Sequence, residues 1–305
     1  MSYLLYHSLK ALYPASSDFI DMGLGISARH ARCRSYWRGH LDNSKNFQIA
    51  AVKELCVSAD WGGRITVLGS GRLFDVPLKQ LLSLSSRVSL YDGDPGAIVQ
   101  TRIAYLRYLK KLSVNCVEIT GVLQSWSEQL VAFLRHNKSE KNLTLLSEFL
   151  DRLSIQKGVL LNSSDLMISL NLLSQIPLYW RDRVFLLILK YWGIELDHDS
   201  CENPLKLALE NSMCLLQQDH LRLLSESKSK RIVLITDTHF NYYQQDRSHW
   251  LVHDALYLDP EVELAQSYTL SRSSSWLWHI APQGIEQQEY GVIHTVKAME
   301  FSVIA

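Results

Sequence analysis

Residues 64–99 read RITVLGSGRLFDVPLKQLLSLSSRVSLYDGDPGAIV. An apolar run at 65–68 leads to a glycine turn, Gly69–Gly71, and then to a helical stretch at 75–84. A second apolar run at 88–91 follows, and it ends in an acidic turn, Asp92–Asp94. This order of strand, glycine turn, helix, strand and acid is typical of a βαβ unit that binds a nucleotide. The stretch therefore predicts an α/β fold.

The two turns supply different chemistry. Gly69 and Gly71 let the backbone approach a ligand closely, because no Cβ intervenes and positive φ angles are free. Asp92 follows roughly twenty residues later, which is the spacing expected of an acid that binds the hydroxyls of a ribose. Open α/β sheets bind ligands outside the carboxyl ends of their strands, where both turns would lie.

The turns also carry a family resemblance. VLGSGR at 67–72 and LYDGDP at 90–95 resemble the first two motifs of class I S-adenosylmethionine-dependent methyltransferases. Leu73 stands where that family usually has another glycine, and the GxGxxG pattern of dinucleotide-binding proteins is not completed. The resemblance implies a Rossmann-like, seven-stranded, mostly parallel sheet with an antiparallel C-terminal hairpin.

A later segment matches the same family. Residues 164–177 read SDLMISLNLLSQIP and resemble the strand-four motif, in which an acid and a hydrophobic run lead to a polar turn beside the transferable methyl group. The resemblance implies S-adenosylmethionine as the cofactor. Its implied contacts are the methionine end for Gly69, Ser70 and Gly71, the ribose for Asp92, the adenine side for Asp94 and the methyl group for Asn171.

Composition limits the function classes. The 305 residues include 31 basic and 31 acidic residues, so no overall field attracts a polyanion and a nucleic-acid partner is not favoured. Five cysteines without CxxC spacing favour a reducing cytoplasm over a disulfide scaffold. Apolar runs are too short for a signal peptide or a membrane span. These features predict a cytoplasmic protein without a membrane partner.

A basic, aromatic segment precedes the glycine unit. Residues 1–60 are expected to form a helical extension, and residues 61–305 the Rossmann-like domain. Cationic or titratable side chains crowd one part of the extension: Arg29, His30, Arg32, Arg34, Arg38 and His40. The segment is either a solvated basic helix, a lid that contacts the substrate, or an RNA-binding patch. In the lid interpretation, Arg34 and His40 bind substrate.

Two further regions have no motif that fixes their role. Residues 124–156 predict a helical insert, which is either a packed helix pair, a cap on the site or the surface of a homodimer. The polar run 197–203 contains metal-ligand residue types, but it is a single loop without ligand spacing, so no metal is expected.

The last part of the chain predicts the acceptor side of the site. The apolar run 232–235 should place His239 at the carboxyl edge of the sheet, where it is a candidate general base. The polar-aromatic segment 239–260 is expected to be a substrate-recognition loop with Tyr242 and Tyr243 as contacts. Two β-rich runs after it predict the antiparallel hairpin.

These inferences predict an enzyme that transfers a methyl group from S-adenosylmethionine to a small molecule. His239 and Asn171 are its candidate catalytic residues. Transfer of the aminocarboxypropyl group of the same cofactor, a nicotinamide-dependent oxidoreductase and a non-enzymatic nucleotide-binding module of the same fold remain as alternatives.

Overall fold

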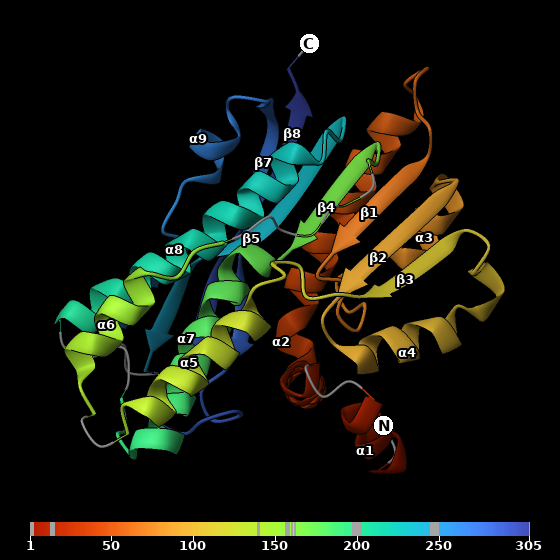
Figure 1. The fold of residues 1–305 in the computed structure, drawn as a ribbon. Helices are drawn as coiled ribbons and strands as arrows, with labels where there is room; N and C mark the ends of the chain where they lie inside the picture. Colours follow the sequence, from red (N-terminus) through yellow and green to blue (C-terminus); the bar gives the residue numbers. More distant parts are fainter. Residues whose placement is uncertain are drawn as a thin grey trace.

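The computed structural model describes residues 3–12, 16–138, 141–155, 159, 161, 163–196, 203–244 and 250–304. A central mixed sheet carries helices on both faces (Figure 1). The strands are β1 (Arg64–Leu68), β2 (Arg87–Asp92), β3 (Leu112–Cys116), β4 (Leu166–Leu170), β5 (Arg231–Tyr243), β6 (Trp250–Asp254), β7 (Tyr268–Ala281) and β8 (Gly291–Val303). The α-helices are α1 (Tyr3–Leu12), α2 (Ser17–Cys56), α3 (Leu78–Leu84), α4 (Pro95–Ala104), α5 (Leu123–His136), α6 (Leu143–Asp151), α7 (Leu172–Trp192), α8 (Asn203–Glu226) and α9 (Pro260–Leu264).

The sheet has the strand order β3-β2-β1-β4-β5-β8-β7. β1 to β5 pair in parallel, and β8 pairs antiparallel with both β5 and β7. The predicted mostly parallel sheet with an antiparallel C-terminal hairpin is therefore confirmed. The order reverses between β1 and β4, and such a switch point opens a crevice outside the carboxyl ends of the strands.

β6 adds an eighth strand. It pairs antiparallel with the second half of β5, in a register from His239 opposite Asp254 to Tyr243 opposite Trp250. The sequence-based assignment of residues 239–243 to a loop is therefore wrong. Phe240, Tyr242 and Tyr243 belong to a β-rich segment, and β5 continues through it because both β6 and β8 supply hydrogen-bonding partners.

The two faces of the sheet are separate cores. Alternate residues of a strand point to opposite faces, so Val67 and Ile168 pack with α2 and α3, whereas Leu68 and Met167 pack with α8 and α9. Figure 1 shows α7 and α8 on one side of the sheet and α2 and α3 on the other. The fold therefore has three layers, with the sheet between two layers of helices. The edge formed by the carboxyl ends of the parallel strands is where the site is expected.

The predicted insert at 124–156 contains two helices, α5 and α6, which pack outside α7 and α8. The four helices share a third core, which includes the buried rings of Trp126, Trp180 and Trp192. Both α5 and α6 bury one face and expose the other. The packed helix pair is thus the arrangement observed, and its role remains a prediction.

α2 spans 40 residues as two helical segments that meet at a kink, where Cys33 has non-helical backbone angles. Polar residues around Ser44 do not interrupt the helix. Buried Ser44 and Gln48 both donate hydrogen bonds to the carbonyl oxygen of Asp75, while the helix continues through them. Within the described residues, no helix is long and apolar enough to cross a bilayer.

Candidate functional site

The glycine turn begins where β1 ends. Gly69 donates its backbone N–H to the carbonyl oxygen of Tyr91, and its φ angle is +73°. A Cβ at this position would lie 2.6 Å from the carbonyl oxygen of Leu170 and 2.8 Å from Cγ of Leu172. Gly69 is therefore required by the close approach of the β4–α7 turn as well as by its backbone angle.

Asp92 ties the glycine turn to the end of β2. Its Oδ2 accepts a hydrogen bond from the N–H of Gly71 at 2.6 Å, and its Oδ1 accepts one from the N–H of Asp94 at 2.8 Å. Burial raises the pKa of Asp92 to about 6, although these two hydrogen bonds oppose the shift. An ionised carboxylate has about four acceptor positions, so Asp92 can still accept hydrogen bonds from a ligand.

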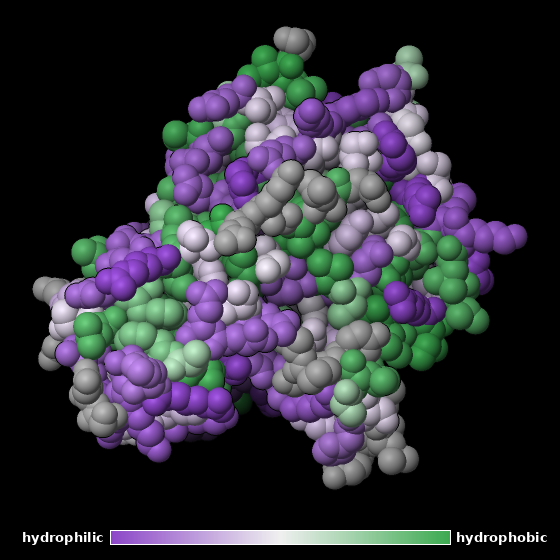
Figure 2. Space-filling view, in the orientation of Figure 1, coloured by the Kyte–Doolittle hydropathy of each residue, from purple (hydrophilic) through white to green (hydrophobic). Residues whose placement is uncertain are grey.

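A cleft of about 940 Å³ opens beside these turns. Its floor includes four of the predicted cofactor contacts: Gly69, Gly71, Asp92 and Asp94. Other walls come from the segment after β3, the start of α7, the first half of α2, and strands β5 and β8. Figure 2 shows the surface hollowed between the α5–α7 helices and the α1–α2 segment. The volume is that of a site for one small ligand.

Asp94 has structural partners in the cleft wall. Its Oδ1 accepts a hydrogen bond from the N–H of Gly96 at 2.7 Å and so caps α4. Its Oδ2 lies 3.2 Å from a guanidinium nitrogen of Arg72, and both side chains are almost fully buried. Asp94 thus fixes the acidic turn and holds Arg72 against it.

The first half of α2 covers this floor. A Cβ at Gly23 would overlap the carboxylate of Asp94, and a Cβ at Gly93 would lie 3.3 Å from the ring of Phe19. Farther along the helix, Arg29 and Arg32 bind the nearly buried carboxylate of Glu286, in the β7–β8 connection, at 3.2 and 2.6 Å. α2 and the hairpin are therefore joined across the cleft.

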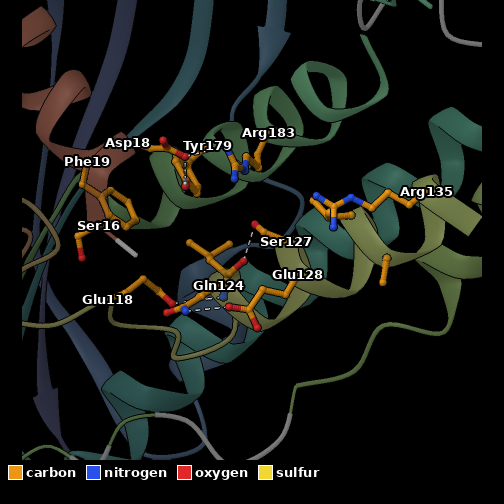
Figure 3. A pocket seen from close by; sticks show the side chains of 13 residues that line it. Ser16, Asp18, Phe19, Glu118, Gln124, Ser127, Glu128, Arg135, Tyr179 and Arg183 are labelled. Atoms are coloured by element: carbon orange, nitrogen blue, oxygen red, sulfur yellow. Dashed lines mark hydrogen bonds and ion pairs between the residues drawn. The ribbon is translucent and has the colours of Figure 1, made fainter. Parts of the chain in front are cut away.

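A side pocket of about 430 Å³ adjoins the cleft between α2, α5 and α7. Figure 3 shows the ring of Phe19 beside that of Tyr179, and their centroids are 4.9 Å apart. Arg183 lies 2.8 Å from Asp18, which also accepts a hydrogen bond from the Tyr179 hydroxyl. Burial, together with the Asp18 carboxylate, raises the pKa of Tyr179 to about 12. The polar groups of this wall are thus paired with one another, and its two stacked rings form a flat aromatic surface.

Several predicted contacts lie outside the lining of the cleft. Ser70 is buried beneath the turn, and Arg34 is exposed on α2. His40 is 2% exposed, stacks on Trp278 at 4.0 Å and accepts a hydrogen bond from Trp276 at Nδ1. Their functional roles remain predictions.

Asn171 takes a structural position at the carboxyl end of β4. It has a φ angle of +56° at the start of α7, and its N–H donates to the carbonyl oxygen of Ile235. Its Oδ1 is buried without a hydrogen-bond partner among the described residues. Leu172, the next residue, lines the cleft beside Gly69. The side chain that a Cβ at Gly69 would meet is therefore that of Leu172, which is apolar.

Tyr242 and Tyr243, the predicted aromatic contacts of the substrate, lie on β5 and line two cavities. Tyr242 lines the main cleft and also an adjoining cavity of about 850 Å³, which Tyr243 lines as well. His239 is not among the lining residues of either cavity; its side chain is 45% exposed, and Nε2 lies 3.4 Å from Asp254 of β6. Its proposed role as a base remains untested.

The sequence analysis missed an acid–imidazole pair. Asp237 on β5 is fully buried, and its Oδ1 lies 3.2 Å from Nδ1 of His294 on β8. The hydroxyl of Ser174 donates a hydrogen bond to Oδ2 at 3.0 Å. His294 lines the cleft. The missed signal was Asp237 itself, an acid in the middle of β5 that follows the apolar run 232–235.

No group of three or more potential metal ligands lies together in the described ranges. Residues 197–202 of the polar run considered for a metal lie outside those ranges, as do residues 245–249 after β5.

The comparisons with known proteins give matches only among solved structures. No family model and no curated protein matches the sequence. A magnesium protoporphyrin IX methyltransferase from Synechocystis PCC 6803 with bound SAM is 10% identical, with a TM-score of 0.37 over 86% of this chain and 79% of that chain. A SAM-dependent methyltransferase from Aquifex aeolicus is also 10% identical, with a TM-score of 0.37 over 83% and 88%. An S-adenosylmethionine-dependent methyltransferase from Clostridium acetobutylicum is 9% identical, with a TM-score of 0.37 over 86% and 91%. Scores this low carry no conclusion about activity.

His40 should make stability pH-dependent. Burial lowers its pKa to about 4, although the charge of Asp237 opposes this shift. Between about pH 6.5 and pH 4, His40 is therefore protonated in the unfolded chain but not in the folded chain. The free energy of unfolding falls as the pH falls through that range. We expect His40 to account for a loss of about 2 kcal/mol between about pH 7 and pH 5.

Urea unfolding of the wild type and of His40→Gln at both pH values measures this loss. The variant should lack the His40 contribution, whereas His136→Gln, on the exposed face of α5, should retain it. An equal pH dependence in the wild type and in His40→Gln would contradict the prediction.

Proposed function

We propose that this chain binds S-adenosylmethionine and transfers its methyl group to a small-molecule acceptor. The observation that supports the proposal is the meeting of Gly69, Gly71 and Asp92 at the carboxyl ends of β1 and β2, on one wall of a cleft of about 940 Å³. A glycine turn lets the backbone approach a nucleoside closely, and a carboxylate with unused acceptor positions can bind the hydroxyls of its ribose.

The residues present fit this cofactor. Asp92 would accept hydrogen bonds from the ribose, Gly69 and Gly71 would border the methionine end, and Asp94 would border the adenine side. The cofactor supplies a methyl group that its sulfonium already activates. The chain's own contribution is to hold donor and acceptor in line, and such alignment is worth about 7–11 kcal/mol of a barrier.

A small-molecule acceptor agrees with the charge and the shape of the site. The chain has no net charge. Each arginine that lines the cleft is paired with a carboxylate: Arg29 and Arg32 share Glu286, Arg72 pairs with Asp94, and Arg183 pairs with Asp18. A polyanion would need a continuous basic surface instead. The cleft has the volume of a site for small ligands.

One observation favours a second candidate, a binding module without catalysis. Leu172, which follows the polar residue Asn171 of the motif, lies against Gly69. An apolar side chain there provides no polar contact to a donor or acceptor. The two candidates differ in whether the cofactor binds and turns over.

Calorimetry with S-adenosylhomocysteine tests the assignment of Asp92. We expect Asp92→Asn to weaken binding about 10- to 100-fold, because hydrogen bonds to a charged acceptor are lost. Wild-type affinity should rise as the pH increases through about 6, where Asp92 ionises. Asp42→Asn, which changes an exposed acid on α2, is the control.

Each possible result has a defined meaning. Unchanged affinity in Asp92→Asn would remove the ribose assignment. No binding by the wild type would overturn the proposed activity and favour the binding module. A melting temperature raised by NADH and unaffected by S-adenosylmethionine would instead indicate a nicotinamide-dependent enzyme.

A further inference from the structure

His294 lies at the cleft wall in front of a buried carboxylate. Its Nδ1 lies 3.2 Å from Oδ1 of Asp237, and the other oxygen of Asp237 accepts the Ser174 hydroxyl at 3.0 Å. Asp237 has no exposed surface, whereas the His294 side chain is 10% exposed and lines the cleft. The carboxylate therefore lies behind the imidazole, and the imidazole lies between it and the cleft.

The charge on Asp237 sets the tautomer of His294. Burial would raise the pKa of Asp237, but the imidazoles of His294 and His40 and the hydroxyl of Ser174 hold it below its ordinary value. Oδ1 of Asp237 and Nδ1 of His294 are both buried and lie 3.2 Å apart without hydrogen-bond geometry, so the carboxylate favours a hydrogen on Nδ1 through its charge. Nε2 of the neutral ring is then an acceptor, which is the form that a general base requires.

Aromatic rings surround this imidazole. The rings of Phe240 and Trp278 have centroids 4.6 and 5.5 Å from that of His294. Tyr242 and Tyr290 line the main cleft together with His294 and also line the adjoining cavity of about 850 Å³. A flat ring is the ligand shape that packs best against such walls.

We propose that the cleft takes an aromatic acceptor with a hydroxyl group, and that Nε2 of His294 removes the hydroxyl proton while Asp237 positions the ring. The inference rests on the proposed methyl transfer for its outcome. The O–H bond breaks, its electron pair stays on oxygen, and the proton forms an N–H bond at Nε2. The oxygen then bonds to the methyl carbon as the carbon–sulfur pair returns to sulfur, and His294 gives its proton to water.

An optical probe tests the proton transfer without any cofactor. 4-Nitrophenol is mixed with the protein about one pH unit below the pKa of the free phenol, where the phenolate band is weak. About a tenth of the free phenol is ionised there, so we expect an excess of wild-type protein to raise the band several-fold and His294→Asn to return it to the level of the free phenol. The asparagine amide keeps a donor toward Asp237 but removes Nε2. Asp237→Asn should lower the band as well, because the tautomer is no longer fixed.

Controls make every outcome decisive. His136→Gln, an exposed histidine on α5, should leave the band unchanged, and circular dichroism shows whether each variant is folded. His294→Gln provides a second test if His294→Asn does not fold. No band in the wild type, an undiminished band in both folded His294 variants, or loss of the band in His239→Gln would overturn the proposal. A phenolate band without S-adenosylhomocysteine binding would support His294 and overturn only the methyl transfer.

Discussion

Gly69→Ala is expected to lower the free energy of unfolding by about 2–4 kcal/mol. The new Cβ would meet the carbonyl oxygen of Leu170 at 2.6 Å, and that backbone belongs to β4, which is paired on both sides. The φ angle of +73° adds the penalty of a left-handed conformation. Neither the strand nor Leu172 can move away without disturbing the core.

Gly71→Ala is the matched comparison for this change. Gly71 also has a positive φ angle, +49°, but a Cβ there would meet no atom within 4 Å. We expect a loss of about 1 kcal/mol, from the backbone angle alone. Chemical unfolding of both variants measures the difference, and equal losses would show that packing against the β4–α7 turn is not what requires Gly69.

Trp180→Ala is expected to cost about 3–5 kcal/mol, because it empties the centre of the helical core. Trp180 is fully buried on α7, its indole N–H donates to Ser212 of α8 at 2.9 Å, and its ring meets that of Trp126 of α5 edge to face. The substitution removes the ring contacts and leaves the Ser212 hydroxyl without its donor.

Thermal unfolding followed by circular dichroism measures this loss. Trp250→Ala is the control, because that ring is 54% exposed on β6, and surface changes of this kind stay within about 0.5 kcal/mol. A loss below about 1 kcal/mol in Trp180→Ala would show that α5, α7 and α8 contribute little to the cooperative unit.

The predictable part of the fold is the part with short-range signals. Gly69, Asp92 and the β1–β2 spacing were found because the turns are encoded in consecutive residues, and their meeting at one edge follows from parallel pairing. β3 runs from Leu112 to Cys116. The residues after it resemble a strand in composition, but they turn along the cleft and carry Glu118 into its wall.

The unpredicted part depends on contacts between distant segments. A β-bulge between Asp237 and His239 changes the side-chain alternation, so the acid points into the core and the histidine lies toward β6. His294 comes opposite Phe240 only through the register of β5 with β8. Neither the bulge nor that register is visible in the residues themselves. The prediction of His239 as a base, made from its expected place at the carboxyl edge of the sheet, stays a prediction.

The position of β8 has a consequence for how the protein is made. β8 lies between β5 and β7, although it follows both of them in the chain. On a ribosome, β5 and β7 emerge before the segment that must join them, so each presents an unpaired backbone edge until residues 291–303 have left the tunnel. Because exposed strand edges promote aggregation, we expect this chain to need a chaperone during its synthesis. Any stop codon before residue 291 should yield an insoluble product.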